Sequence, residues 1–257
     1  MTNRINLYES AALREVTGAV IRPGGLALTE RALEVCKLSA GARVLDVGCG
    51  SGVTVMHLRQ CHELKAVGLD LCWPLLREGR HQAGPTPLIQ GRAQALPLGD
   101  GGQAAIFCEC VLSLLAAPEI ALAEWHRVLV LGGFLAITDL YTRSGPTKTP
   151  SAAPSRCCIA GAVDRKTLLQ RIVAAGFEVL LFEDHTPLLK QLAAQLVWTH
   201  GSLESFWAKT GTICGAFESP KPGYYLLVAE KCEAKSDFRH RPLPPGNRCN
   251  RETPWMS

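Results

Sequence analysis

Residues 44–52 read Val-Leu-Asp-Val-Gly-Cys-Gly-Ser-Gly, and helical spacing follows them over about Val53 to Gln60. The apolar residues around Asp46 predict a short buried strand. Glycines at positions 48, 50 and 52 predict a tight turn at which the backbone approaches a ligand closely. The helix that follows presents free N–H groups in its first turn. The stretch is therefore typical of a strand, a turn and a helix that together bind a ligand.

Strand-like and helical patterns alternate along the rest of the chain. Further strands are expected at Lys65–Asp70, Pro87–Gln90, Ala104–Phe107, Phe134–Thr138, Glu178–Phe182 and Tyr224–Glu230, and further helices at 118–130, 165–175 and 187–207. Pro118 suits the first turn of its helix, and Gly132-Gly133 is expected to end that helix. Alternating strands and helices with short connections favour a parallel sheet covered by helices on both faces. The sequence therefore predicts an α/β fold.

Three segments of different composition are expected. Residues 1–40 form a helical lead-in, with Thr29 as a helix cap, and Tyr8 and residues 22–25 (Arg-Pro-Gly-Gly) fold over the bound ligand as a lid. Residues 41–232 form the α/β domain, which includes a mobile loop over 141–156 and a helical insertion over 187–222. Residues 233–257 are rich in Pro, Arg and Asn and are expected to be disordered.

The bulk composition excludes several classes of protein. The 257 residues are 47% hydrophobic, which is enough for a sizeable packed domain. The formal net charge is +4, and the last 25 residues hold five basic against three acidic groups, so the body lacks the basic face of a nucleic-acid binder. No apolar run has the length of a membrane span or of a signal core. We therefore expect a cytoplasmic protein that binds no membrane and whose 11 cysteines are free thiols.

Two classes of ligand suit the glycine turn. A dinucleotide site has the spacing Gly-x-Gly-x-x-Gly, whereas Gly48, Gly50 and Gly52 are spaced Gly-x-Gly-x-Gly. Asp46 would repel a pyrophosphate but suits the cationic amino-acid end of S-adenosylmethionine. Asp70 ends the second strand, where a carboxylate accepts hydrogen bonds from two ribose hydroxyls in either class. The spacing and Asp46 together favour S-adenosylmethionine.

The glycine turn resembles the first motif of class I S-adenosylmethionine-dependent methyltransferases, hydrophobic-Leu-Asp-hydrophobic-Gly-Cys-Gly-x-Gly. Residues 91–97 (Gly-Arg-Ala-Gln-Ala-Leu-Pro) and 127–133 (Arg-Val-Leu-Val-Leu-Gly-Gly) are similar to two later motifs of that family. The departures are Arg92 and Ala104, at which the family has aspartate. The resemblance implies a Rossmann-like fold with a seven-stranded, mostly parallel sheet whose last strand is antiparallel, and S-adenosylmethionine as the cofactor.

The same resemblance implies a set of cofactor contacts and an activity. The contacts are Asp46, Gly48, Cys49, Gly50, Gly52, Asp70, Leu71, Ala93, Gln94 and Cys108. The implied activity is transfer of a methyl group to a small-molecule or metalloid acceptor. Two alternatives remain open at this point. The glycine spacing disfavours an NAD-dependent oxidoreductase, and the presence of Asp46 and Asp70 disfavours a domain that binds S-adenosylmethionine without transferring methyl.

The cysteines indicate a possible acceptor. Residues 110–114, 138–141 and 158–162 are similar, in order, to arsenite methyltransferases, in which a cysteine before Gly-Ala binds trivalent arsenic. Cys158 occupies that position and Cys110 is expected to border the same crevice, where soft thiolates would suit a soft element. With Asp139, placed to orient a substrate, they are the candidate catalytic residues. No metal site is predicted, because Cys108-x-Cys110 lacks the usual two-residue spacer. The sequence carries no signal for an oligomeric state.

Overall fold

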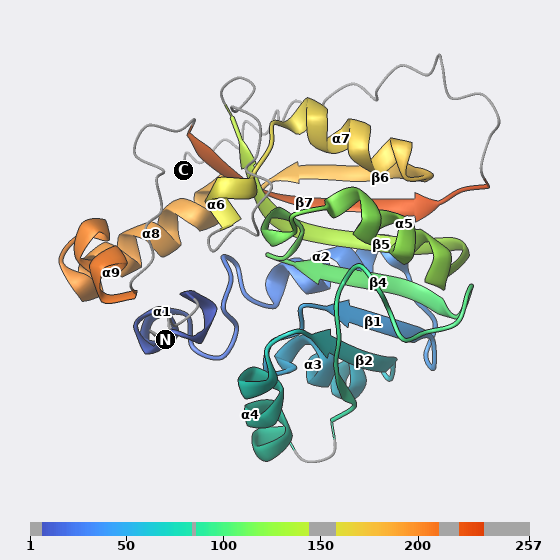
Figure 1. The fold of residues 1–257 in the computed structure, drawn as a ribbon, viewed down its shortest axis with the longest axis horizontal. Helices are drawn as coiled ribbons and strands as arrows, with labels where there is room; N and C mark the ends of the chain where they lie inside the picture. The colour runs from blue at the N-terminus through green and yellow to red at the C-terminus, as the bar shows by residue number, and fades with distance from the viewer. Residues whose placement is uncertain (1–6, 84–85, 144–157, 211–220, 234–257) are drawn as a thin grey trace, which may run out of the picture.

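The computed structural model describes residues 7–83, 86–143, 158–210 and 221–233. Seven strands form one sheet in the order β3-β2-β1-β4-β5-β7-β6 (Figure 1). They are β1 Arg43–Val47, β2 Lys65–Asp70, β3 Leu88–Gln90, β4 Gln103–Glu109, β5 Leu129–Thr142, β6 Phe177–Asp184 and β7 Pro222–Lys231. The first five run parallel, and β7 lies antiparallel between β5 and β6. The predicted α/β fold with an antiparallel last strand is confirmed.

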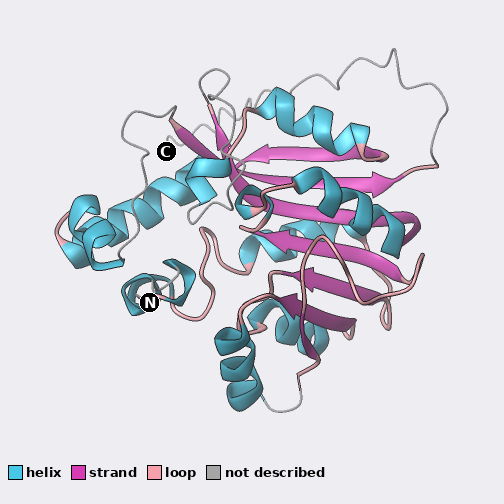
Figure 2. Ribbon diagram, viewed as in Figure 1, coloured by secondary structure: helices cyan, strands magenta, loops and turns pink. Residues whose placement is uncertain are grey.

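Helices cover both faces of the sheet (Figure 2). One face packs against α5 (Pro118–Val128) and α7 (Arg165–Ala174), and the other against α2 (Ala27–Cys36), α3 (Val53–Cys61) and α4 (Trp73–Ala83). Successive residues of β1 enter opposite cores: Leu45 packs in the cluster that contains Trp125, and Val44 in the cluster that contains Leu58. Because both faces are buried, β1 is apolar on both sides, as parallel sheets require.

A third group of helices lies beyond the carboxyl ends of the parallel strands (Figure 1). It comprises α1 (Ala11–Thr17), α8 (Thr186–His200) and α9 (Leu203–Thr210), which share a small core around Leu13, Leu196 and Phe206. Arg14 on α1 also forms an ion pair of 2.6 Å with Glu78 on α4. The lead-in and the segment between β6 and β7, far apart in sequence, therefore meet beyond the carboxyl edge of the sheet.

Several element boundaries differ from those that the sequence predicts. Gly132-Gly133 does not end a helix but lies inside β5, because the strand has already begun at Leu129, which pairs with Gln103. A side chain at Gly133 would clash with the backbone of Val130. The expected loop over 141–156 begins later, since β5 continues to Thr142 in register with β7.

The described part of the expected helical insertion over 187–222 contains the two helices α8 and α9. Gly201, with a φ of 86°, separates α8 from α9, and residue 222 already belongs to β7. The short helices η2 (Leu112–Leu114) and α6 (Cys158–Gly161), together with α4, are additional to the expected elements, whereas η1 (Leu7–Glu9) and α1 lie within the expected helical lead-in. The rest of the expected mobile loop and nearly all of the expected disordered tail lie outside the described residues. No helix in the described part of the chain is long and apolar enough to cross a membrane.

Candidate active site

The glycine turn joins β1 to α3, and each of its glycines meets a different constraint. All three have a positive φ, at 77° for Gly48, 56° for Gly50 and 83° for Gly52. A side chain at Gly48 would lie 2.1 Å from Val111, and one at Gly52 would lie 2.8 Å from Leu88. At Gly50 nothing lies within 4 Å of the position that a side chain would take. The middle of the turn therefore borders open space, as a backbone that approaches a ligand must.

Asp70 closes the turn from the neighbouring strand. Its Oδ2 accepts a hydrogen bond of 2.8 Å from the Gly50 N–H, and its Oδ1 accepts one of 2.7 Å from the Cys72 N–H. These two bonds, one to each carboxylate oxygen, fix the orientation of the side chain. The carboxylate is thereby held beside the open space over Gly50.

Three acidic residues lie at or next to the ends of neighbouring strands at this edge: Asp46 on β1, Asp70 on β2 and Glu109 on β4. Asp46 is 2% exposed, and burial raises the pKa of its carboxyl. The negative charge of Glu109 raises that pKa further, while the guanidinium of Arg22 lowers it. The edge is thus an acidic environment of low solvent exposure, which favours a ligand that carries positive charge.

Arg22 and Glu109 form the centre of a buried polar network. Their Nη2 and Oε2 atoms are 2.9 Å apart, and their side chains are only 9% and 5% exposed. Thr29 on α2 donates to Glu109 at 2.8 Å, and Thr54 on α3 donates at 3.0 Å. Thr29 is therefore not the helix cap that the sequence predicts; the cap is Leu26, and the Thr29 hydroxyl reaches into the site.

Glu109 is the residue of this network that sequence analysis misses. A signal exists, because Glu109 is the one charge in the otherwise apolar stretch from Ala104 to Leu115. Buried carboxylates need a partner, but the partner is 87 residues away in the lead-in, so no local pattern could identify it.

Asp139, a candidate catalytic residue, holds a loop in place. It is 1% exposed and accepts hydrogen bonds from Ser113 N (2.8 Å), Ser113 Oγ (2.7 Å) and Leu140 N (2.7 Å). Burial raises the pKa of its carboxyl to about 6, although these donors lower it. The carboxylate anchors η2, the segment after β4, to the end of β5.

The structure places the candidate cysteines on different elements near the site. Cys108 is fully buried in the core, and burial raises the pKa of its thiol well above its usual range. Cys110 is 8% exposed, and its Sγ lies 3.3 Å from the Tyr224 hydroxyl. Cys158 begins α6, which packs closely on η2, because a side chain at Gly161 would lie 1.8 Å from the Ser113 carbonyl. Cys157 lies outside the described residues.

The remaining predicted contacts line the side of the site near β2 and β3. Leu71 is 64% exposed at the end of β2 and presents an apolar surface. Ala93 is buried, and the Trp125 indole donates to its carbonyl at 3.0 Å, which fixes the segment that also carries the half-buried Gln94. Cys49 packs over Gly68, and burial raises the pKa of its thiol, so its side chain fills space beneath the turn.

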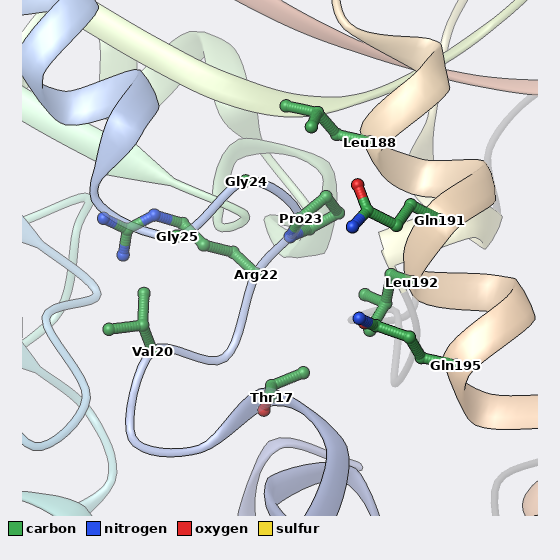
Figure 3. A pocket seen from close by; sticks show the side chains of 10 residues that line it. All are labelled: Thr17, Val20, Arg22, Pro23, Gly24, Gly25, Leu188, Gln191, Leu192 and Gln195. Atoms are coloured by element: carbon green, nitrogen blue, oxygen red, sulfur yellow. The ribbon is translucent and has the colours of Figure 1, made fainter. Parts of the chain in front are cut away.

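A cavity of about 210 Å³ lies between the lead-in and α8. Figure 3 shows that Gln191 and Gln195 extend from α8 toward the loop of residues 20–25, while the Arg22 guanidinium points away from α8. Val20, Leu188 and Leu192 add apolar walls. Because Arg22 lines this cavity and also pairs with Glu109, one loop borders both the cavity and the acidic edge.

The seven-stranded sheet and the glycine turn are similar to those of known methyltransferases. Residues 45–137 match the family described as a methyltransferase domain. An uncharacterized methyltransferase of Synechocystis is 31% identical over 114 residues, which cover 44% of this chain and 53% of the relative. A malonyl-acyl-carrier-protein O-methyltransferase of Laribacter hongkongensis is 30% identical over 156 residues, which cover 54% of this chain and 51% of the relative. The chain thus spans about half the length of these relatives.

Solved structures extend the likeness over nearly the whole chain. The cyclase SpnF matches with a TM-score of 0.68 at 23% identity and covers 88% of this chain and 93% of its own. Phosphoethanolamine N-methyltransferase 2 of Haemonchus contortus, solved in complex with S-adenosyl-L-methionine, matches with a TM-score of 0.71 at 14% identity and covers 90% of this chain and 59% of its own. At these identities the likeness establishes the fold, and the fold alone does not define the reaction.

Proposed function

We propose that this protein transfers a methyl group from S-adenosylmethionine to a small organic acceptor. The main observation in support of this proposal is the position of the Asp70 carboxylate at the end of β2. It accepts a hydrogen bond from the Gly50 N–H and lies beside the open space over Gly50. The family match over residues 45–137 and the methyltransferases among the relatives support the same reaction. When bound, S-adenosylmethionine would supply a methyl group attached to a positively charged sulfur. An acceptor lone pair would form the new bond to the methyl carbon in line with the carbon–sulfur bond, which breaks and leaves the sulfur as a neutral thioether.

The residues present fit this cofactor. In our proposal Asp70 accepts from the two ribose hydroxyls, and the exposed side chain of Leu71 covers one face of the adenine. Asp46 lies at the amino-acid end, where the positive charge of the cofactor would stabilise the ionised form of its carboxyl against the raised pKa. The buried Arg22 Nε has no partner among the described residues, so it is available to the cofactor carboxylate.

The chain contributes mainly orientation and exclusion of water. Asp139 has all its contacts within the protein, so we propose that it positions η2 and do not assign it the role of a base. The lead-in loop lies against both the acidic edge and the cavity, where it would keep water from the reacting methyl group. We propose the cavity beside Gln191 as the acceptor site. Its size and its mixture of amide and apolar walls suit a small, uncharged organic molecule.

A metalloid acceptor has less support than an organic one. Among the described side chains, Cys108 is buried in the core and the Cys110 thiol contacts Tyr224, so neither is an accessible thiolate of the kind that a metalloid would need. The cytoplasmic location and the absence of a nucleic-acid substrate remain predictions from the sequence.

The decisive experiment is isothermal titration of the reduced protein with S-adenosylhomocysteine. Asp70→Ala removes two charge-assisted hydrogen bonds worth roughly 1.5–3 kcal/mol each, so it should weaken binding by about 100-fold or more. Asp100→Asn is the control, since Asp100 is exposed and precedes β4 at the opposite edge of the sheet. Tight binding of NAD in place of S-adenosylhomocysteine would refute the proposal. Binding without methyl transfer to any acceptor in a broad screen would favour a non-catalytic domain.

A further inference from the structure

A cluster of two histidines and one glutamate lies outside the candidate active site. Glu30 is on α2, His57 is on α3, and His62 is the C-cap residue that directly follows α3. The Nε2 atoms of both histidines contact the same carboxylate oxygen, Glu30 Oε1, and the His62 contact measures 2.8 Å. The ligand atoms of the three residues all lie within 4.8 Å of one another.

The end of α3 creates this convergence. Five residues of regular helix would turn His57 and His62 to different sides. His62 instead leaves the helix, with φ −122° and ψ 4°, so that its ring comes back toward His57. The two ring centroids are 5.4 Å apart at an angle of 69°. Both imidazoles therefore present Nε2 to the same point in space.

We propose that Glu30, His57 and His62 bind a divalent transition metal ion of the Zn²⁺ type that ties α2 to α3. Two imidazole nitrogens and one carboxylate oxygen are a donor set that Zn²⁺ prefers. With bonds of roughly 2.0–2.1 Å, tetrahedral Zn²⁺ holds its ligands about 3.3 Å apart, so the side-chain ends need to open only slightly. The side chains are 43%, 18% and 30% exposed, which leaves a fourth position open to water.

The tie would act on the same two helices that hold the buried network. Glu30 directly follows Thr29 on α2, and His57 lies one turn after Thr54 on α3, and both threonines donate to Glu109. Metal binding would thus join α2 and α3 a second time, at the protein surface. The inference stands on this geometry alone and does not depend on methyl transfer.

The test uses the full chain, reduced and freed of metal with a chelator. Zn²⁺ is titrated calorimetrically, and Co²⁺ is added as a spectroscopic probe. Even an outer partner of a metal ligand is worth roughly 10–100-fold in affinity, so His57→Gln and His62→Gln should each weaken binding by at least about 100-fold. His185→Gln is the matched control, because His185 also contacts a glutamate, Glu183, but belongs to no three-ligand cluster among the described residues.

The proposal predicts one equivalent of Co²⁺ with the visible bands of a tetrahedral nitrogen and oxygen site. That signal should persist in His185→Gln and vanish in His62→Gln. Thiolate charge-transfer bands alone would assign the metal to cysteines and overturn the proposal. Equal titrations of the intact protein and His62→Gln would overturn it too, because they would show that the metal does not bind at this site. His62 lies at a half-exposed helix end, so His62→Gln remains informative if His57→Gln misfolds. Zn²⁺ should also raise the melting temperature of the intact protein and of His185→Gln, but not that of His62→Gln.

Discussion

Single buried carboxylates near the ligand edge have different environments and hence different roles. Asp46 faces the charges of Glu109, Arg22 and Asp70, so its ionisation responds to whatever binds there. Asp139 faces neutral donors from Ser113 and Leu140, so its ionisation concerns the stability of the loop. The sequence identifies both aspartates from their positions at the expected ends of strands, although in the structure β1 continues to Val47 and β5 to Thr142. It does not distinguish their roles, because the groups around them come from other segments.

Asp139 should make the stability of the protein depend on pH. Its pKa is raised in the folded state from 3.8 to about 6. Between these values the folded protein holds a proton that the unfolded chain has lost, so the free energy of unfolding falls as the pH rises through this window. The full decrease for two pKa units is about 3 kcal/mol. Asp139→Asn has no titrating carboxyl at this position, so this pH-dependent part of the free energy of unfolding is absent from it. The variant loses some stability because its amide faces the Ser113 N–H, but that loss does not change with pH.

Urea unfolding of both proteins at pH 4, 5, 6 and 7 measures the effect. The stability of the intact protein relative to Asp139→Asn should decline from pH 4 through pH 6 and level off by about pH 7. Groups that titrate equally in both proteins cancel in this difference. A difference that stays constant over the range would show that the folded-state pKa of Asp139 is not raised.

At the scale of elements, the lead-in is part of the site. Its loop contributes Arg22 and α2 contributes Thr29, and both reach Glu109 at the end of β4. The sequence predicts α2 from its helical spacing, but it does not predict that α2 contacts β4. The reason is that helical spacing predicts which face is buried but not which strand that face meets.

The Arg22–Glu109 pair should be strongly coupled. Arg22→Met leaves a buried carboxylate without its charge partner, which costs about 3–5 kcal/mol of stability. Glu109→Gln leaves the guanidinium buried but keeps an acceptor for the threonines, so its cost should be smaller. The double variant removes both charges and should lose less stability than the sum of the two single losses.

A double-mutant cycle by chemical denaturation measures this coupling. Independent sites add within roughly 0.3–0.5 kcal/mol. Losses that add within this margin would mean that the pair contributes nothing as a pair.

At the scale of the whole molecule, the cavity exists because two distant segments meet. The loop of residues 20–25 forms one wall and α8 forms the other, and α1 and α9 share a core with α8 at the same end of the sheet. Neither wall has a local binding motif. The cavity therefore depends on the connection after β6 folding back over the lead-in.

Filling this cavity should stop turnover without loss of cofactor binding. Gln191→Trp places a bulky ring in the cavity, and a misplaced acceptor loses about 100-fold in rate. Ala194→Trp is the control, since Ala194 is exposed on α8 and does not line the cavity. Release of S-adenosylhomocysteine, with an acceptor found by screening, measures turnover, and calorimetry measures cofactor binding. Equal turnover in the two variants would place the acceptor elsewhere.

Local spacing along the chain is sufficient for the α/β class, most strands, the glycine turn, and the positions of Asp46 and Asp70. These features depend on residues close in sequence, where periodicity and backbone preference act directly. Tertiary structure alone shows that Glu109 pairs with Arg22, that Thr29 enters the site, that Asp139 anchors η2, and that Glu30 meets His57 and His62. Each of these contacts joins segments 26 to 87 residues apart, and such contacts form only when packing of the sheet and its helices brings the segments together.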